Sequence, residues 1–200
     1  MENKDFEMGE EIRCWGVCIP DNAAEEVAKT LESTWINTGK KEKEFRNKIC
    51  ERFQAPYAIA CMSGTEALKI ALRALGVGPG DEVVSTPFTF IATNMAILEV
   101  GAKPVFADIQ YDTLNIDPNS VEQKITEKTK AIMCVHYAGN PVDLDELRAV
   151  AQRHNLPIIE DSAHAMTSEY KGQPIGSTGD IATFSFQCVK IVTCGDGGVV

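Results

Sequence analysis

Two residues in the last quarter of the chain, Asp161 and Lys190, have the types and order needed for chemistry on an amino group. Asp161 follows the apolar run LPIIE, and Lys190 ends the run SFQCVK just before the glycine-rich CGDGG. A lysine amine can bond to an aldehyde carbon, and a carboxylate at a strand end can hold a ring nitrogen protonated. The pair therefore predicts a pyridoxal phosphate (PLP) enzyme. The neighbours of the lysine are apolar, so we expect surroundings that keep the amine neutral: Val189, Ile191 and Val192.

A phosphate site is predicted where a helix begins. In SGTEAL, Ser63, Gly64 and Thr65 bring free backbone N–H groups, hydroxyls and the positive end of the helix dipole to one point. An ordinary capped helix explains the same residues, so their position relative to Lys190 decides in favour of a phosphate. Ser185 in FSF offers a second hydroxyl for that group.

Further side chains are candidates for lining the same site. His164 could donate to the phenolic oxygen of PLP, and Phe88 could stack on a flat heteroaromatic ring, although a structural role explains each of them as well. Glu160 competes with Asp161 for any ligand role. Because adjacent strand residues face opposite ways, only one of the two carboxylates can point at the cofactor, and periodicity leaves that choice open.

The elements that must position these residues alternate between strand and helix from about residue 58. Capping boxes, Ser63 with Glu66 and Asp143 with Glu146, begin two of the expected helices. Helices are expected in SGTEALKIALRALG, FIATNMAILEVG, DPNSVEQKI and DLDELRAVAQRHN, and strands in DEVVSTP, KPVFADI, AIMCVHYAG, LPIIED, IATFSF and GGVV. This order predicts an α/β fold whose mostly parallel sheet is flanked by helices.

Residues 1–57 form a different region, with two helical stretches, DNAAEEVAKTLEST and KEKEFRNKICERF, joined by the turn-rich WINTGKK. We expect this N-terminal segment to pack on a main, PLP-binding domain formed by residues 58–200. The sequence stops at Val200 within an expected strand, with no cap, turn or polar tail. The main domain is therefore expected to be incomplete at its C-terminus.

Composition and charge narrow the class of protein. The 200 residues are 44% apolar and 24% charged, which suits one soluble globular domain. A net charge of -10 argues against a general nucleic-acid or anionic-membrane surface. No stretch approaches the roughly 20 apolar residues of a membrane span, and the acidic N-terminus is unlike a signal peptide, so we expect a cytoplasmic protein.

The cysteines and glycines argue against other kinds of site. The seven cysteines are odd in number and mostly fall inside expected strands or helices, which favours reduced thiols over a disulfide framework. Cys14 and Cys18 have no second CxxC-type pair, so no metal site is expected. A nucleotide-binding Rossmann domain is disfavoured because no GxGxxG follows an early strand.

In this order, the residues resemble the DegT/DnrJ/EryC1/StrS family of PLP-dependent sugar aminotransferases, within the aspartate aminotransferase fold superfamily. The resemblance runs from about WINTG to the last residue and is specific because many motifs occur in one order. The motifs are WINTG, SGTEAL, GVGPGDEVVSTPFTFIAT, GAKPVFADI, NIDP, TKAI, VH with GNPVDLDEL, IIEDSAHA, YKGQPIGSTGD, FSFQCVK and GDGG. The family usually has Asn after the lysine and GEGG further on, where this chain has Ile191 and Asp196.

The resemblance implies a role for each candidate. Lys190 matches the lysine that forms the Schiff base with PLP, Asp161 matches the partner of the pyridine nitrogen, and His164 matches a position near the PLP hydroxyl. Phe88 matches the aromatic residue that stacks on the ring. The remaining candidates match phosphate contacts: Gly64, Thr65 and Ser185.

The resemblance also implies a reaction. Such enzymes typically take an amino group from glutamate and transfer it to a keto group of a nucleotide-linked sugar, in amino sugar or polysaccharide biosynthesis, and they are homodimers. Family members are nearly twice as long, and their smaller C-terminal domain is expected to be absent here. A non-catalytic fragment that binds PLP weakly is therefore an alternative. A PLP-dependent sugar dehydratase is a second alternative, although that branch typically has His in place of Lys190.

Overall fold

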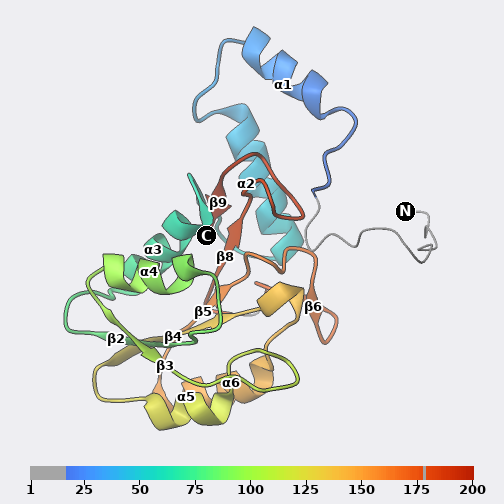
Figure 1. Ribbon diagram of the computed structural model, residues 1–200. Helices are drawn as coiled ribbons and strands as arrows, with labels where there is room; N and C mark the ends of the chain where they lie inside the picture. The colour runs from blue at the N-terminus through green and yellow to red at the C-terminus, as the bar shows by residue number, and fades with distance from the viewer. Residues whose placement is uncertain (1–16, 178) are drawn as a thin grey trace, which may run out of the picture.

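The computed structural model describes residues 17–177 and 179–200, and its centre is a seven-stranded sheet with the order β1-β9-β8-β5-β4-β2-β3 (Figure 1). The strands are β1 (Ala60–Cys61), β2 (Glu82–Ser85), β3 (Lys103–Phe106), β4 (Thr129–Val135), β5 (Ile158–Asp161), β8 (Ile181–Ser185) and β9 (Gly198–Val199). Neighbours from β8 to β3 pair in parallel, whereas β9 runs antiparallel to both β8 and β1.

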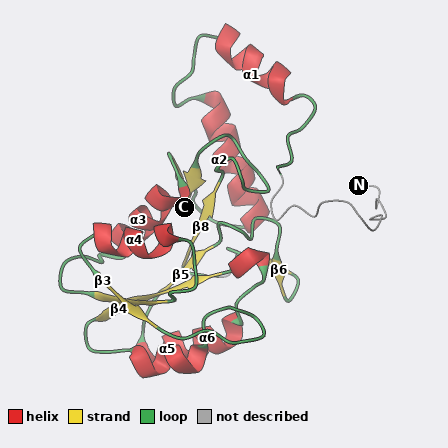
Figure 2. Cartoon of the chain, in the orientation of Figure 1, coloured by secondary structure: helices red, strands yellow, loops and turns green. Residues whose placement is uncertain are grey.

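Helices cover both faces of the parallel part of the sheet (Figure 2). One face carries α3 (Gly64–Ala74) and α4 (Ile91–Glu99), and the other carries α5 (Pro118–Lys124) and α6 (Leu144–His154). Alternate strand residues enter two cores: Val83 and Ile159 pack with α3 and α4, whereas Val84 and Ile158 pack with α5 and α6. The expected α/β fold with a mostly parallel, helix-flanked sheet is confirmed.

Side-chain caps fix where two of these helices begin. Ser63 Oγ accepts the N–H of Glu66 at 3.2 Å at the start of α3, and Asp143 Oδ1 accepts the N–H of Glu146 at 3.2 Å at the start of α6. Loss of such a cap typically costs about 1 kcal/mol of stability. The cap on α3 matters for the site, because it sets the position of the backbone N–H groups in the first turn.

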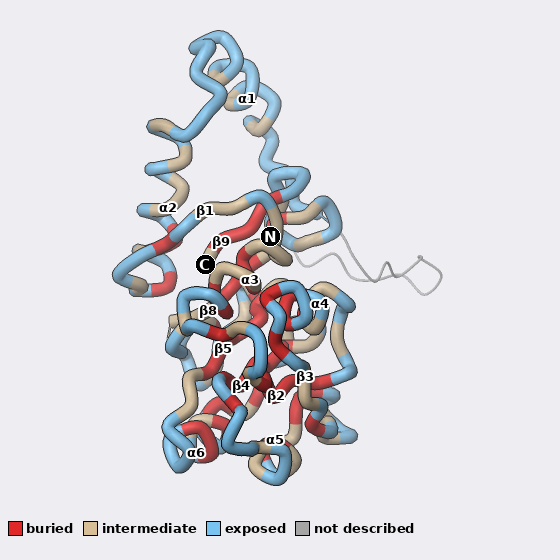
Figure 3. The backbone as a smooth tube through the Cα atoms, turned by 90° about the vertical axis from the view of Figure 1, so that its left-hand side faces the viewer, coloured by how far each residue is buried: buried red, intermediate tan, exposed pale blue. Residues whose placement is uncertain are grey.

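The N-terminal helices, α1 (Ala23–Glu32) and α2 (Lys40–Phe53), are integrated to different degrees. In α2, Ile49 and Phe53 are buried, and the Phe53 ring stacks on Phe184 of β8 at a centroid distance of 4.6 Å. By contrast, α1 has no buried residue and lies beyond the packed body (Figure 3). Of these two helices, only α2 contributes side chains to the core.

Some short elements lack a clear sequence signal. The expected strand AIMCVHYAG ends at Val135, and a 3-10 turn, Tyr137–Gly139, follows it. A hairpin of β6 (Glu169–Tyr170) and β7 (Gln173–Pro174) lies between β5 and β8. Two-residue strands are too short to display the alternation that marks longer ones. Within the described ranges, no helix is long and apolar enough to cross a membrane.

Candidate active site

Asp161 is a buried carboxylate at the carboxyl end of β5, where open parallel sheets place their ligands. Its Oδ2 accepts a hydrogen bond from the Thr93 hydroxyl of α4 at 2.7 Å, and its Oδ1 accepts the N–H of Ala163 at 3.2 Å. Both oxygens are therefore held, one from a helix and one from the loop that follows the strand. Each oxygen retains room for a further donor.

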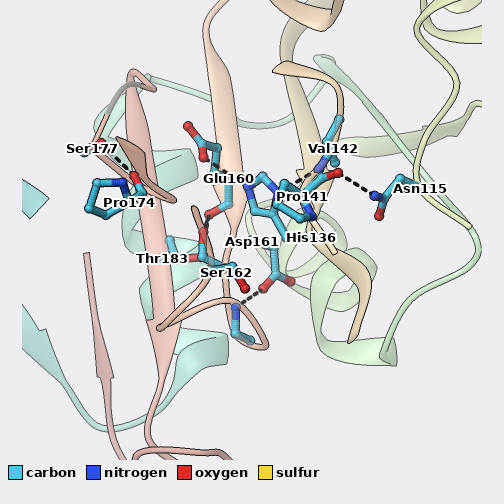
Figure 4. A network of polar contacts seen from close by, with 12 residues as sticks. Asn115, His136, Pro141, Val142, Glu160, Asp161, Ser162, Pro174, Ser177 and Thr183 are labelled. Atoms are coloured by element: carbon cyan, nitrogen blue, oxygen red, sulfur yellow. Dashed lines mark hydrogen bonds and ion pairs between the residues drawn. The ribbon is translucent and has the colours of Figure 1, made fainter. Parts of the chain in front are cut away.

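Glu160 points to the opposite face of the sheet (Figure 4). Its Oε2 lies 3.0 Å from Nε2 of the buried His136, and Nδ1 of that ring accepts the N–H of Val142 at 3.1 Å. Because Nδ1 accepts, a neutral His136 carries its proton on Nε2 and donates it to Glu160. Of the two adjacent carboxylates, Asp161 is thus the one on the face covered by α3 and α4.

Lys190 lies in the loop between β8 and β9, where it is half-buried. Burial lowers the pKa of its amine, and the negative charge of Asp161 acts in the opposite direction. Among the described residues, the amine has no hydrogen-bond or ion-pair partner. The sequence predicted that flanking apolar side chains would surround this amine. That prediction is wrong, because these side chains are exposed and do not themselves bury the amine: Val189, Ile191 and Val192.

His164 belongs to the same group of charges. Burial lowers the pKa of its imidazole, nearby Lys190 lowers that pKa further, and Asp161 opposes both effects. An imidazole with a pKa below 6.5 is mostly neutral at pH 7. Its buried Nδ1 has no hydrogen-bond partner within the described chain, which leaves the hydrogen-bonding capacity of this atom unsatisfied. The structure brings His164, Asp161 and Lys190 within electrostatic range of one another.

Phe88 reaches this group through Tyr137, which the sequence reasoning missed. The Phe88 and Tyr137 rings lie 4.6 Å apart between centroids, and Tyr137 meets His164 edge-on at 6.3 Å. The N–H of Tyr137 donates to Asn115 Oδ1 at 3.1 Å, which anchors the turn. Tyr137 follows the carboxyl end of β4 as Asp161 ends β5, and this shared position was the signal that could have identified it.

The proposed phosphate residues converge where α3 meets the sheet. A Cβ added to Gly64 would lie 2.7 Å from Ser185 Cβ, so the first turn of α3 lies directly against β8. The Ser63 hydroxyl caps this helix, whereas the N–H groups of Gly64 and Thr65 belong to the first turn and have no partner within the helix. Beside them, Gly198 of β9 passes so close that any Cβ there would overlap the Ser63 carbonyl.

The burial and hydrogen-bonding of these residues fit PLP, and this argument uses no related protein. The unpartnered Lys190 amine suits an aldehyde, the buried Asp161 suits a protonated ring nitrogen, and the unpartnered Nδ1 of His164 suits a phenolic oxygen. At Gly64 and Thr65, a helix N-terminus suits a phosphate. The role of each residue nevertheless remains a prediction from the sequence.

The structure corrects the expectation that most of the cysteines lie inside strands or helices. Cys18, Cys188 and Cys194 lie in exposed loops, not inside strands or helices, because the segment after β8 is a loop and residue 18 makes only an isolated bridge to Val192. Cys14 lies outside the described residues. In residues 17–177 and 179–200, no cluster of three or more His, Cys, Asp or Glu side chains is placed to hold a metal ion.

The chain is similar in sequence and fold to known proteins, several of which are aminotransferases. The chain is 46% identical over 176 residues to the spore coat polysaccharide biosynthesis protein SpsC of Bacillus subtilis, covering 88% of this chain and 45% of that protein. An aminotransferase structure from Psychrobacter cryohalolentis is 44% identical with a TM-score of 0.88, covering 92% of this chain and 47% of that one. The PLP form of a proposed sugar aminotransferase from Streptococcus pneumoniae is 40% identical with a TM-score of 0.90, covering 95% and 52%.

The chain thus spans about half the length of the curated relatives it matches. The model of the DegT/DnrJ/EryC1/StrS aminotransferase family matches residues 17–200, which include every residue of the candidate site. On this match, and on the same order of motifs in the sequence, the chain belongs to the DegT/DnrJ/EryC1/StrS aminotransferase family.

Proposed function

We propose that this chain belongs to a PLP-dependent aminotransferase that moves an amino group, taken from glutamate, to a keto group of a nucleotide-linked sugar. One observation carries the proposal: the partner-free Lys190 amine, with its lowered pKa, lies within electrostatic range of the buried Asp161 and of His164. An amine with a lowered pKa, close to a fixed carboxylate, is what a carbonyl cofactor with a basic ring nitrogen requires.

The residues divide the binding of PLP among them. The first turn of α3, with Gly64 and Thr65, and the Ser185 hydroxyl of β8 would bind the phosphate. Asp161 would hold the proton on the ring nitrogen, and His164 would hydrogen-bond the phenolic oxygen through Nδ1, which has no partner within the described chain. Phe88, supported by the Tyr137 ring, would cover one face of the cofactor.

When bound, PLP supplies an electron-withdrawing ring that stabilises negative charge on the carbon that carries the amino group. In the resting enzyme, Lys190 Nζ would hold the cofactor by its aldehyde carbon. Once an amino donor has taken its place, the released Nζ would accept the proton from the donor carbon and, as an ammonium group, would return it to the former aldehyde carbon of the cofactor. Asp161 would keep the ring nitrogen protonated, a role that suits a carboxylate whose two oxygens are each held by a hydrogen bond.

The substrate and the assembly are inferred from the relatives. One of them is a spore coat polysaccharide biosynthesis protein and another is a proposed sugar aminotransferase, which support a sugar substrate. The nucleotide on the sugar, glutamate as donor and the homodimer are inferred from the family resemblance, and a cytoplasmic location is inferred from the sequence itself. A second candidate is a chain that binds PLP without transferring an amino group, because it spans about half the length of its relatives.

Chemical trapping tests the proposal directly. Incubation with PLP, reduction with borohydride and mass spectrometry of the peptides should place the added mass on Lys190 of the wild-type chain. Lys190→Ala should carry no label, while Lys48→Ala, which changes an exposed lysine of α2, should be labelled like wild type. Label spread over surface lysines would contradict the assignment. Specific label without amino transfer would favour the second candidate.

A further inference from the structure

Thr93, in the first turn of α4, makes a buried contact that family resemblance did not single out. The side chain is 1% exposed, and its hydroxyl lies 2.7 Å from Oδ2 of Asp161, which is 5% exposed. These two residues are far apart in sequence and come from a helix and from a strand end. The contact therefore exists only because α4 packs over the carboxyl end of β5.

The direction of this hydrogen bond follows from its partners. An ionised carboxylate only accepts, so the Thr93 hydroxyl must donate its single proton to Asp161. Thr89 Oγ1 lies 2.8 Å from Thr93 Oγ1, and since the Thr93 proton is already used, Thr89 is the donor in that contact. A directed chain thus runs from Thr89 through Thr93 to the carboxylate. It begins one residue after Phe88, in the loop that would cover the cofactor ring.

We propose that Thr93 is a positioning residue for PLP, which orients the Asp161 carboxylate toward the ring nitrogen. The inference rests on the proposed function. Two donors from different elements, the Thr93 hydroxyl and the Ala163 N–H, each bind one oxygen of the carboxylate and so fix its plane. The remaining acceptor positions then have a single orientation before any ligand arrives, which lowers the cost of binding.

A purely structural role for Thr93 makes a different prediction. If the side chain only fills space between α4 and β5, valine should replace it well, because valine has nearly the same shape without the hydroxyl. If the hydroxyl orients Asp161, valine should weaken the contact to the ring nitrogen in particular. The two roles separate when the ligand itself can be offered with and without that nitrogen.

The experiment measures affinity for PLP and for an analogue with carbon in place of the ring nitrogen, by absorbance titration of the full chain. Wild type should bind PLP more tightly than the analogue. Thr93→Val should bind PLP about tenfold more weakly, the scale of a hydrogen bond to a charged group, and bind the analogue within twofold of wild type. Thr93→Ser, which keeps the hydroxyl, should restore the PLP preference. Thr129→Val, which removes a buried hydroxyl in β4, is the matched control and should leave both affinities unchanged.

Each of the other outcomes would contradict either the positioning role of Thr93 or the role proposed for Asp161. If Thr93→Val loses affinity for PLP and for the analogue equally, or for neither, the positioning role is wrong while the proposed function stands. If Thr93→Ser fails to restore the preference, the hydroxyl is not the operative group and the inference also falls. If wild type binds both ligands equally, Asp161 does not serve the ring nitrogen, and the assignment of that residue in the proposed function is wrong.

Discussion

Glu160 and Asp161 are adjacent in β5, yet they lie on opposite faces of the sheet with different kinds of partner. Glu160 accepts from the buried His136, and its Oε1 has no partner among the described residues. Asp161 accepts from Thr93 and Ala163 and lies within electrostatic range of Lys190. Similar burial therefore accompanies two different roles. We propose that Glu160 stabilises the fold on one face of the sheet and that Asp161 serves a ligand on the other face.

Substitution of Asp161 should have the largest effect and should separate the two faces. We expect Asp161→Ala to reduce amino transfer about a thousandfold, because it removes a positioned charge from the reacting centre. Glu160→Gln should stay within threefold of wild type in the same rate assay. Equal losses of rate in both variants would contradict the division between the faces.

Substitution of Glu160 should instead act on stability. Glu160→Ala leaves the Nε2–H of His136 buried without its acceptor, so the free energy of unfolding should fall by about 2 kcal/mol in urea denaturation. Glu160→Gln is the control and should cost less than about 1 kcal/mol, since an amide oxygen can still accept that proton. A stable Glu160→Ala variant would show that the pair does not secure this face.

A methyl group at residue 64 should weaken PLP binding on the face of the sheet covered by α3 and α4, with little effect on the face that carries Glu160. Gly64→Ala would place a carbon 2.7 Å from Ser185 Cβ, so the first turn of α3 must move away from β8. We expect about tenfold weaker PLP binding in absorbance titration, in line with an overpacking cost of about 1–3 kcal/mol. Gly78→Ala, at a position with room for a methyl group, should bind PLP as wild type does.

The smallest expected effect concerns the cost of burying the Lys190 amine. Its pKa is lowered in the folded chain, so below that pKa the unfolded state binds the proton more favourably and the fold is weakened. Lys190→Met should therefore raise the thermal midpoint slightly at pH 7. The gain should shrink as pH rises through the lowered pKa toward 10.5, where both states lose the proton.

The sequence could predict the elements with strong local signals. Ser63 and Asp143 mark helix starts, and both make the expected caps in the structure. The segments DEVVSTP, AIMCVHYAG and LPIIED were correctly predicted to contain strands, and the structure shows that β2, β4 and β5 are largely buried because they are covered on both faces. The short strands β1, β6 and β7 escaped prediction, since their pairing depends on distant partners and not on their own residues.

In the candidate site, too, residues with a local sequence signal could be predicted, whereas residues placed by tertiary packing could not. Position at a strand end identified Asp161, and the choice over Glu160 required the family resemblance. The structure supplies the missing physical argument: Asp161 has the same parity in β5 as Ile159, which packs with α3 and α4. Thr93 and Tyr137 were missed because they reach the site through tertiary packing, from a helix and from a turn that no local pattern places beside Asp161.

The close passage of Gly198 beside Ser63 has a consequence for mutational tolerance. Because any side chain at position 198 would overlap the Ser63 carbonyl, a saturation library should retain glycine alone at this position whenever selection requires activity. Neighbouring Val199 is a buried apolar residue and should accept isoleucine or leucine. A comparison of the residues tolerated at positions 198 and 199 would then test in cells, without protein purification, whether β9 lies against the start of α3.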